Sequence, residues 1–211
     1  MSSELPITLD GLRKNLKAIE LLSEYFDLGI FSSNEDCDWF VIEPAQDFTV
    51  FAREGAGGRF LLLETTGWVI YVSSEGKAGV LGYSLLDFLH LVVVHPYWED
   101  LLKFSGKGIL DEMRKALPML EESLVGEEPE IDSARNSLMA AFHITSNADP
   151  VEALHHAVSS SRSQIIVRAT MDDSVYESLF NHFTVKDNPF WRNAQPCAAQ
   201  PRSFQSLEAA Q

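Results

Sequence analysis

Hydrophobic positions divide the chain into a helical beginning, a series of short strands and a helical remainder. From Thr8 to Asp27, large apolar residues recur every three or four positions, a spacing typical of one amphipathic helix. Gly29 follows this stripe, and we expect it to end the helix in a left-handed conformation. Ser32–Asp38 is polar and acidic and predicts a loop, whereas the run Trp39–Glu43 predicts a first strand that Pro44 ends.

The next stretch of the chain, from Phe48 to Leu91, predicts an antiparallel meander followed by a buried helix. Runs of β-branched, aliphatic and aromatic residues alternate with glycine-bearing breaks, as in consecutive hairpins. These runs are Phe48–Ala52, Phe60–Leu63, Trp68–Val72 and Ala78–Leu81. Together with the first strand, Trp39–Glu43, they make about five strands. Ser84 and Asp87 then have the spacing of a capping box, and Leu85–Val94 is apolar nearly all round. The pattern therefore predicts an α+β fold with this helix in its core.

Further amphipathic segments predict helices beyond the meander and a smaller second unit. Helices are expected around Trp98–Phe104 and Ile109–Leu124, which completes an α+β domain over residues 1–125. Gly126–Asp132 (GEEPEID) has the composition of an acidic linker. Residues 133–187 then predict a small, mostly helical annex that packs on the first domain or on a second copy of the chain, and residues 188–211 predict a disordered tail. Within the annex, the expected elements are helices at Ser133–Phe142, Pro150–Val158 and Ser174–Phe183 and a strand at Gln164–Arg168.

The charge of the chain limits its partners. With 16 basic and 31 acidic residues, the net charge is −15, which repels nucleic acid and anionic membranes and favours a basic protein partner. Solubility alone is an alternative explanation for this charge. The sequence begins without the basic and apolar regions of a signal peptide, and Cys37 and Cys197 predict unpaired thiols, so we expect a soluble cytoplasmic protein. Both a monomer and a homodimer are compatible with the pattern.

Three segments are similar to catalytic motifs, but each departs from its motif where the chemistry depends on it. Gly55–Gly58 precedes a strand rather than a helix, so it predicts a hairpin turn and not a phosphate site. Gly76-Lys77 lacks the hydroxyl residue that would bind magnesium, because Ala78 follows it. Around Ser84, leucine stands where a nucleophile elbow has its closing glycine. The six histidines show no metal-binding spacing, so we expect no cofactor and no enzyme activity. An active site made from dispersed acids or histidines remains an alternative.

The candidate partner-binding residues are Glu35, Asp36, Asp38 and Trp39. Tryptophan is frequent among the residues that dominate protein interfaces, and Trp39 follows directly on the acidic residues. The alternative is that Trp39 belongs to the hydrophobic core.

Residues 8–120 resemble the SUKH superfamily, which includes fungal cell-wall assembly regulators and bacterial immunity proteins of toxin systems. The resemblance rests on four features: the N-terminal helix Thr8–Asp27, the run Phe60–Leu63 after Gly57-Gly58, the run Trp68–Val72, and the helix that begins SLLDFLHL at Ser84. It implies an α+β domain whose surface binds a protein without a cofactor. From it we expect an immunity protein that neutralises a toxin, or alternatively a regulatory adaptor with several partners.

Overall fold

The computed structural model confirms the α+β class and describes residues 7–145 and 149–191. The described helices are α1 (Leu9–Lys14), α2 (Leu16–Tyr25), α3 (Leu85–Val94), α4 (Trp98–Lys103), α5 (Leu110–Glu127), α6 (Ile131–Ala141) and α7 (Pro150–Ser161), with a short 3-10 helix η1 (Val185–Asp187). The described strands are β1 (Gly29–Glu35), β2 (Phe40–Glu43), β3 (Phe48–Arg53), β4 (Arg59–Leu63), β5 (Val69–Val72), β6 (Lys77–Gly82), β7 (Ile166–Ala169) and β8 (Glu177–Ser178).

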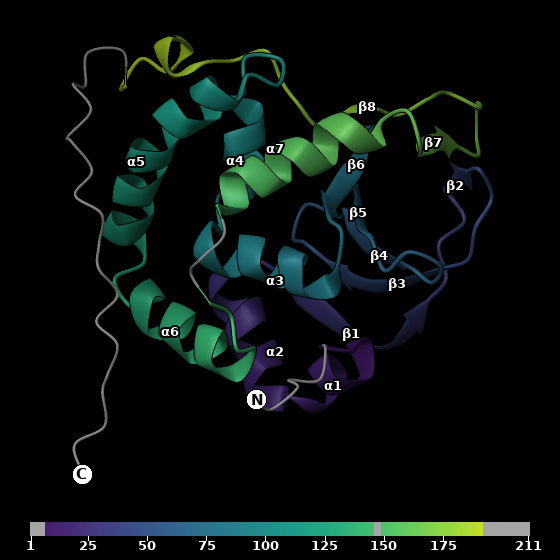
Figure 1. Cartoon of the computed structure of the whole chain (residues 1–211), viewed down its shortest axis with the longest axis horizontal. Coiled ribbons are helices and arrows are strands. Elements are labelled where there is room, and N and C mark those ends of the chain that lie inside the picture. The colour runs from purple at the N-terminus through teal and green to yellow at the C-terminus, as the bar shows by residue number, and fades with distance from the viewer. Residues whose placement is uncertain (1–6, 146–148, 192–211) are drawn as a thin grey trace.

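The strands form two sheets. The main sheet has the order β1-β3-β4-β5-β6-β8, and all its neighbours are antiparallel except β6 and β8. Strands β3 to β6 are the predicted meander. β2 and β7 pair with each other in a separate antiparallel ribbon, in which Phe40 lies opposite Ala169 and Glu43 opposite Ile166. In Figure 1, α3 lies between the main sheet and the helices α5 and α6, and the ribbon lies on the far side of the sheet.

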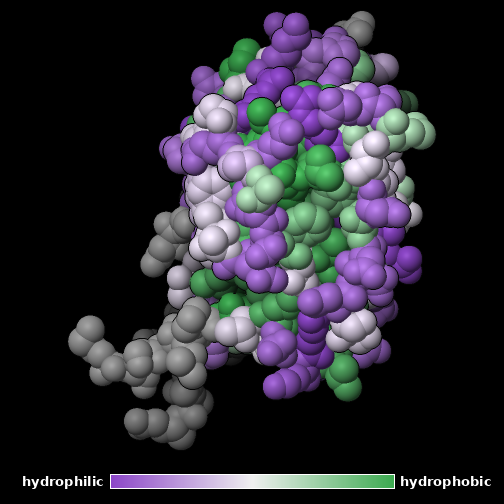
Figure 2. All heavy atoms as spheres, turned by 90° about the vertical axis from the view of Figure 1, so that its right-hand side faces the viewer, coloured by the Kyte–Doolittle hydropathy of each residue, from purple (hydrophilic) through white to green (hydrophobic). Residues whose placement is uncertain are grey.

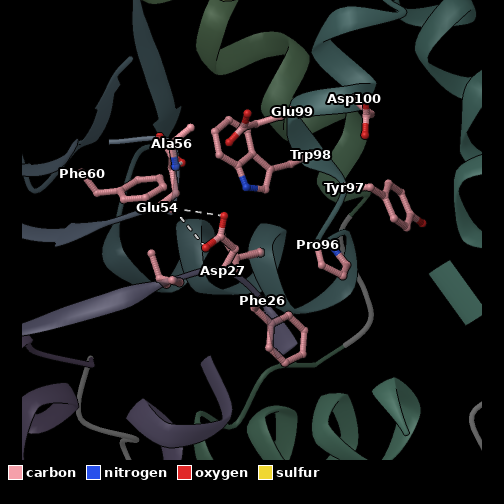
Figure 3. A pocket seen from close by; sticks show the side chains of 13 residues that line it. Phe26, Asp27, Glu54, Ala56, Phe60, Pro96, Tyr97, Trp98, Glu99 and Asp100 are labelled. Atoms are coloured by element: carbon pink, nitrogen blue, oxygen red, sulfur yellow. Dashed lines mark hydrogen bonds between the residues drawn. The ribbon is translucent and has the colours of Figure 1, made fainter. Parts of the chain in front are cut away.

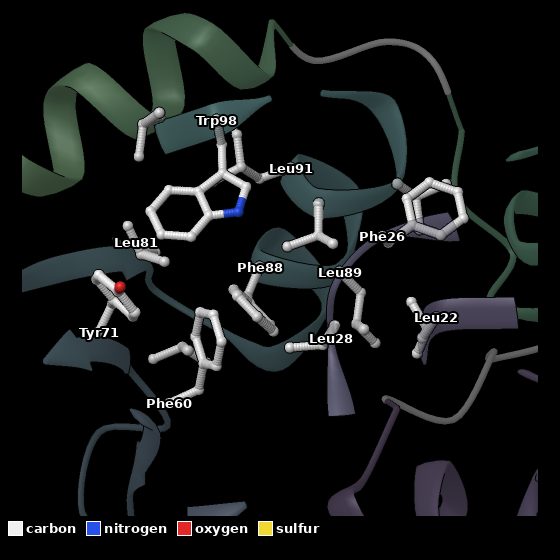
Figure 4. Close-up of a cluster of buried hydrophobic side chains, with 14 of the residues drawn as sticks. Leu22, Phe26, Leu28, Phe60, Tyr71, Leu81, Phe88, Leu89, Leu91 and Trp98 are labelled. Atoms are coloured by element: carbon white, nitrogen blue, oxygen red, sulfur yellow. The ribbon is translucent and has the colours of Figure 1, made fainter. Parts of the chain in front are cut away.

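Both faces of the main sheet are covered, because side chains of each strand alternate between two cores. Phe60 and Tyr71 point to the helical side, where they join Phe88 and Trp98 in the larger core (Figure 4). Their neighbours Leu61 and Ile70 belong to the second core, which lies between the main sheet and the ribbon. These strands therefore read as nearly continuous apolar runs rather than as an alternation of apolar and polar residues.

The predicted start of the buried helix α3 is confirmed. The side chain of Ser84 accepts a hydrogen bond from the backbone N–H of Asp87 at 3.1 Å. Of the ten residues of α3, six are buried: Leu85, Phe88, Leu89, Leu91, Val92 and Val93.

The prediction of one N-terminal helix was wrong, because the chain forms two helices that meet at Asn15. Asn15 ends α1 and also begins α2, where its side chain accepts a hydrogen bond from the N–H of Ala18 at 3.2 Å. The apolar stripe continues across this break, which explains why periodicity alone did not detect it. Gly29 does not end the helix but begins β1; Asp27, with φ of 47°, is the left-handed residue.

The predicted loop Ser32–Asp38 was wrong in part, and the predicted helix Ser174–Phe183 was wrong. Ser32 to Glu35 are the end of β1, an edge strand whose exposed side chains are polar. The second segment forms no helix and contains β8.

The residues expected to form a linker and an annex are continuous with the rest of the fold. α5 extends to Glu127 and α6 begins at Ile131, so the acidic stretch is mostly helical. Leu138 of α6 and Leu154 of α7 are buried in the larger core, together with residues of α2 and α3. Of the expected tail, only residues 188–191 lie within the described part of the chain, where Trp191 packs on Phe104 at 4.7 Å between ring centroids.

Candidate functional site

The four predicted site residues lie together where β1 leads into β2. Glu35 ends β1, and the side chains of Glu35, Asp36 and Asp38 are exposed. Trp39 is half-buried: its ring packs edge-on against Phe40 with the centroids 4.9 Å apart. Its indole contributes to the second core and keeps some exposed surface.

A segment from the other end of the chain completes this region. Thr170 donates hydrogen bonds to the carbonyl oxygens of Trp39, from its N–H at 3.1 Å, and of Asp38, from its hydroxyl at 2.7 Å. Tyr176 lies beside Trp39, with the ring centroids 6.3 Å apart. We call the exposed side of residues 35–43 and 166–177 the ribbon surface.

The ribbon surface carries exposed apolar side chains among acidic ones. Figure 2 faces this side of the molecule and shows hydrophobic residues framed by hydrophilic ones. The large exposed apolar residues here are Val41 (45% exposed), Ile166 (37%), Val175 (53%) and Met171 (93%). Seven acidic residues belong to the same two segments: Glu35, Asp36, Asp38, Glu43, Asp172, Asp173 and Glu177. Arg168 is the one basic residue of these segments, and it donates to Glu43 at 2.9 Å.

A second concave region, the acidic pocket, lies at the opposite end of β1. It has a volume of about 310 Å³ and is formed by Phe26–Leu28, Glu54–Ala56 and Pro96–Asp100, with Phe60 and Val92. These segments connect α2 to β1, β3 to β4, and α3 to α4, and Figure 3 shows their side chains around the pocket. The aromatic part of the lining is deeply buried, since Phe26 and Trp98 are each 4% exposed.

Asp27 and Glu54 orient the first two segments toward one another. The N–H of Gly55 donates to both carboxylate oxygens of Asp27, at 3.0 and 3.2 Å (dashed in Figure 3). The carboxylate of Glu54, which is 6% exposed, accepts from the N–H groups of Ala56 and Gly58 and from the hydroxyl of Tyr71. The glycine-rich turn thus directs its N–H groups at a carboxylate of its own chain.

The pocket is negative and contains no internal cation. Asp27, Glu54, Glu99 and Asp100 line it, and within the described residues no lysine, arginine or histidine does. Desolvation in the pocket, followed by repulsion from Glu54, Asp100 and Asp27, raises the pKa of Glu99 to about 7, although its side chain reaches solvent at the pocket mouth. Asp100 forms an ion pair with Lys103 at 3.6 Å, and both side chains are about half exposed.

A buried polar network holds the third segment of the pocket in place. Arg135 of α6 is 8% exposed and donates to both carboxylate oxygens of Glu121, at 2.6 and 2.9 Å. The hydroxyl of Tyr97 donates to the same carboxylate at 2.6 Å and lies 3.1 Å from Nδ1 of His95. Burial lowers the pKa of His95 to about 4, so this imidazole is neutral at pH 7. The network therefore connects α5 and α6 to the residues that begin α4.

We expect Gly58→Ala to destabilise the pocket wall. A Cβ atom at position 58 would lie 2.5 Å from Cε2 of Tyr71 and 2.6 Å from Oε1 of Glu54, so the wall would have to move. Overpacking of this kind costs about 2 kcal/mol, which chemical denaturation measures. Gly126→Ala is the control, because nothing lies within 4 Å of a Cβ there and alanine favours the helix. Equal stability of the two variants would contradict this account of Gly58.

Sequence reasoning found the acidic loop but missed the residues that face it and those of the pocket. Asp27, Glu54 and Glu99 belong to three distant segments, and no spacing relates them. One local signal was available for Glu54, since an acidic residue directly before a glycine-rich hairpin can accept hydrogen bonds from the N–H groups of the turn.

Comparisons with known proteins give no assignment: no family model, no curated protein and no solved structure matches the chain. Among the described residues, no helix has the length and apolar character needed to cross a membrane. The same residues contain no group of three or more His, Cys, Asp or Glu side chains that could hold a metal ion.

Proposed function

We propose that this protein is a non-catalytic binding domain of the immunity type, which binds and neutralises a basic toxin in the cytoplasm through its ribbon surface. One observation carries the proposal. Val41, Ile166, Val175 and Met171 are exposed on two segments that hold seven acidic residues and one basic residue. Apolar side chains within a polar rim are typical of protein interfaces.

Charge complementarity selects the kind of partner. Arg168 is already paired with Glu43 and Asp173, so the remaining carboxylates of the ribbon surface, among them Asp36 and Asp38, attract positive charge from outside. A basic protein would approach such a surface faster than a neutral one, and salt would slow the approach. The resemblance to immunity proteins of the SUKH superfamily agrees with this partner.

Two other functions are alternatives. A regulatory adaptor could use the same surface, and it would bind several partners with modest affinity where an immunity protein binds one tightly. An enzyme with a dispersed acid/base site is favoured by Glu99, because a carboxyl group with a pKa of about 7 in a pocket is suited to proton transfer.

The proposal is tested by using the tagged protein as bait in lysate of its native organism and identifying what is retained. We expect one dominant basic protein, lost progressively as salt rises, that is toxic when expressed alone and harmless when co-expressed with this chain. Several partners in small amounts would favour the adaptor. Failure to retain any basic protein at low salt would contradict the proposed function and favour the enzyme.

Reversing the charge of the acidic loop is expected to weaken the complex. Asp36→Lys with Asp38→Lys should lower affinity for the retained partner at least tenfold, mainly through slower association, as measured by surface plasmon resonance. Both side chains are exposed, so the fold should persist. Glu20→Lys with Glu122→Lys makes the same change in net charge at two exposed helical positions and is the matched control. Equal affinity of the two double variants would show that the acidic loop is not part of the interface.

A further inference from the structure

We propose that the acidic pocket is a second binding site, which takes the guanidinium group of an arginine residue in a peptide chain. Asp27 lies just before β1 and Glu35 ends it, so the pocket and the ribbon surface lie at opposite ends of that strand and are formed by different segments. The pocket can therefore be occupied independently of the partner proposed above.

The size of the pocket suits one long side chain. Its volume of about 310 Å³ is at the lower end of the range for small-molecule sites, roughly 300–1,000 Å³. The mouth is formed by turns from three separate parts of the chain, so a side chain can enter while its backbone stays outside.

The lining matches both parts of an arginine side chain. Phe60 and Val92 give an apolar surface for the aliphatic stem. Trp98 also lines the pocket, but it is only 4% exposed and packs against Phe60 and Tyr71, so it adds apolar contact rather than an open ring face. A guanidinium group is more weakly hydrated than an ammonium group, so it enters such a lining more readily.

The carboxylates supply the opposite charge. Asp27 is held in place by the N–H of Gly55, so it is oriented before a ligand arrives. Glu54 is 6% exposed and accepts three hydrogen bonds from its own chain, so it contributes negative charge rather than a free acceptor. Glu99 accepts no hydrogen bond from another group in the described chain, and desolvation, followed by repulsion from the neighbouring carboxylates, raises its pKa. A guanidinium group carries five N–H donors and can bind acceptors from several directions at once.

The same charges disfavour free arginine. Its α-carboxylate would lie near the mouth of a pocket lined by Asp27, Glu54, Glu99 and Asp100 and would be repelled. Within a peptide this carboxylate is an uncharged amide. The pocket therefore favours an arginine residue over the amino acid.

The test is a titration of ¹⁵N-labelled protein with the blocked tripeptide acetyl-Gly-Arg-Gly-amide, followed by NMR. We expect saturable shifts of the Gly55 and Ala56 amides and of the Trp98 indole N–H. Peptides with citrulline or lysine in place of arginine, and free arginine, should each bind at least tenfold more weakly. Citrulline keeps the shape of arginine and removes its charge, so it isolates the electrostatic contribution.

Glu99→Gln should weaken binding of the arginine peptide about tenfold, because the amide oxygen still accepts a hydrogen bond but no longer carries the negative charge that strengthens it. Its side chain is at the pocket mouth, so the spectrum should otherwise be unchanged; Glu20→Gln, at an exposed position of α2, is the control. The proposal is overturned by absent shifts, by equal binding of any of the three comparison ligands, or by equal binding to Glu99→Gln. None of these results bears on the proposed function, which is contradicted only when the lysate experiment retains no basic partner.

Discussion

Replacing Phe88 with alanine is expected to lower the free energy of unfolding by about 4 kcal/mol. Phe88 is fully buried at the centre of α3, and its ring packs against Phe51 at 5.8 Å and Phe60 at 5.1 Å between centroids. These contacts join α3 to the middle of the main sheet, and the truncation would leave a cavity that a close-packed core cannot fill. Urea denaturation followed by circular dichroism measures the change.

Phe190→Ala makes the same truncation at a side chain that is 90% exposed and should change stability by less than about 0.5 kcal/mol. If Phe88→Ala lost no more than this control, Phe88 would not be the centre of the core.

Replacing Arg135 with methionine is expected to cost about 3 kcal/mol. The change removes two hydrogen bonds to Glu121 and leaves that carboxylate, shared with Tyr97, without its cation. The cost should exceed that of losing an exposed ion pair, because the side chain of Arg135 is almost completely buried and that of Glu121 is mostly buried. The same denaturation measurement applies.

A double variant separates the lost charge from lost packing. Glu121→Gln in the Arg135→Met background removes the unpaired carboxylate, so the double variant should be more stable than Arg135→Met alone. A double variant that is less stable, with additive losses, would show that the two residues are not energetically coupled.

The local patterns of this chain were predictable and the long-range ones were not. The meander and the cap of α3 could be predicted because glycine-bearing turns and a serine before an apolar run act within a few residues. β1 was missed because an edge strand with one polar side has the composition of a loop. The break at Asn15 was missed because the apolar stripe is the same for one helix as for two.

The candidate sites illustrate the same limit. Glu35, Asp36, Asp38 and Trp39 are close in sequence, so their grouping could be predicted. Thr170 and Tyr176 complete that region only through pairing of β2 with β7, which no local signal encodes. The acidic pocket depends on three turns brought together by the core, so its carboxylates could be grouped only after the fold was known.

The pairing of β2 with β7 also sets when the ribbon surface is complete during synthesis. Phe40 is synthesised early, but its partner Ala169 emerges only after all seven described helices have been made. A nascent chain with the complete meander still lacks half of the ribbon surface. The ribbon surface is therefore complete only after residue 177 has been made, and a chain released before that point would have most of the main sheet without this surface.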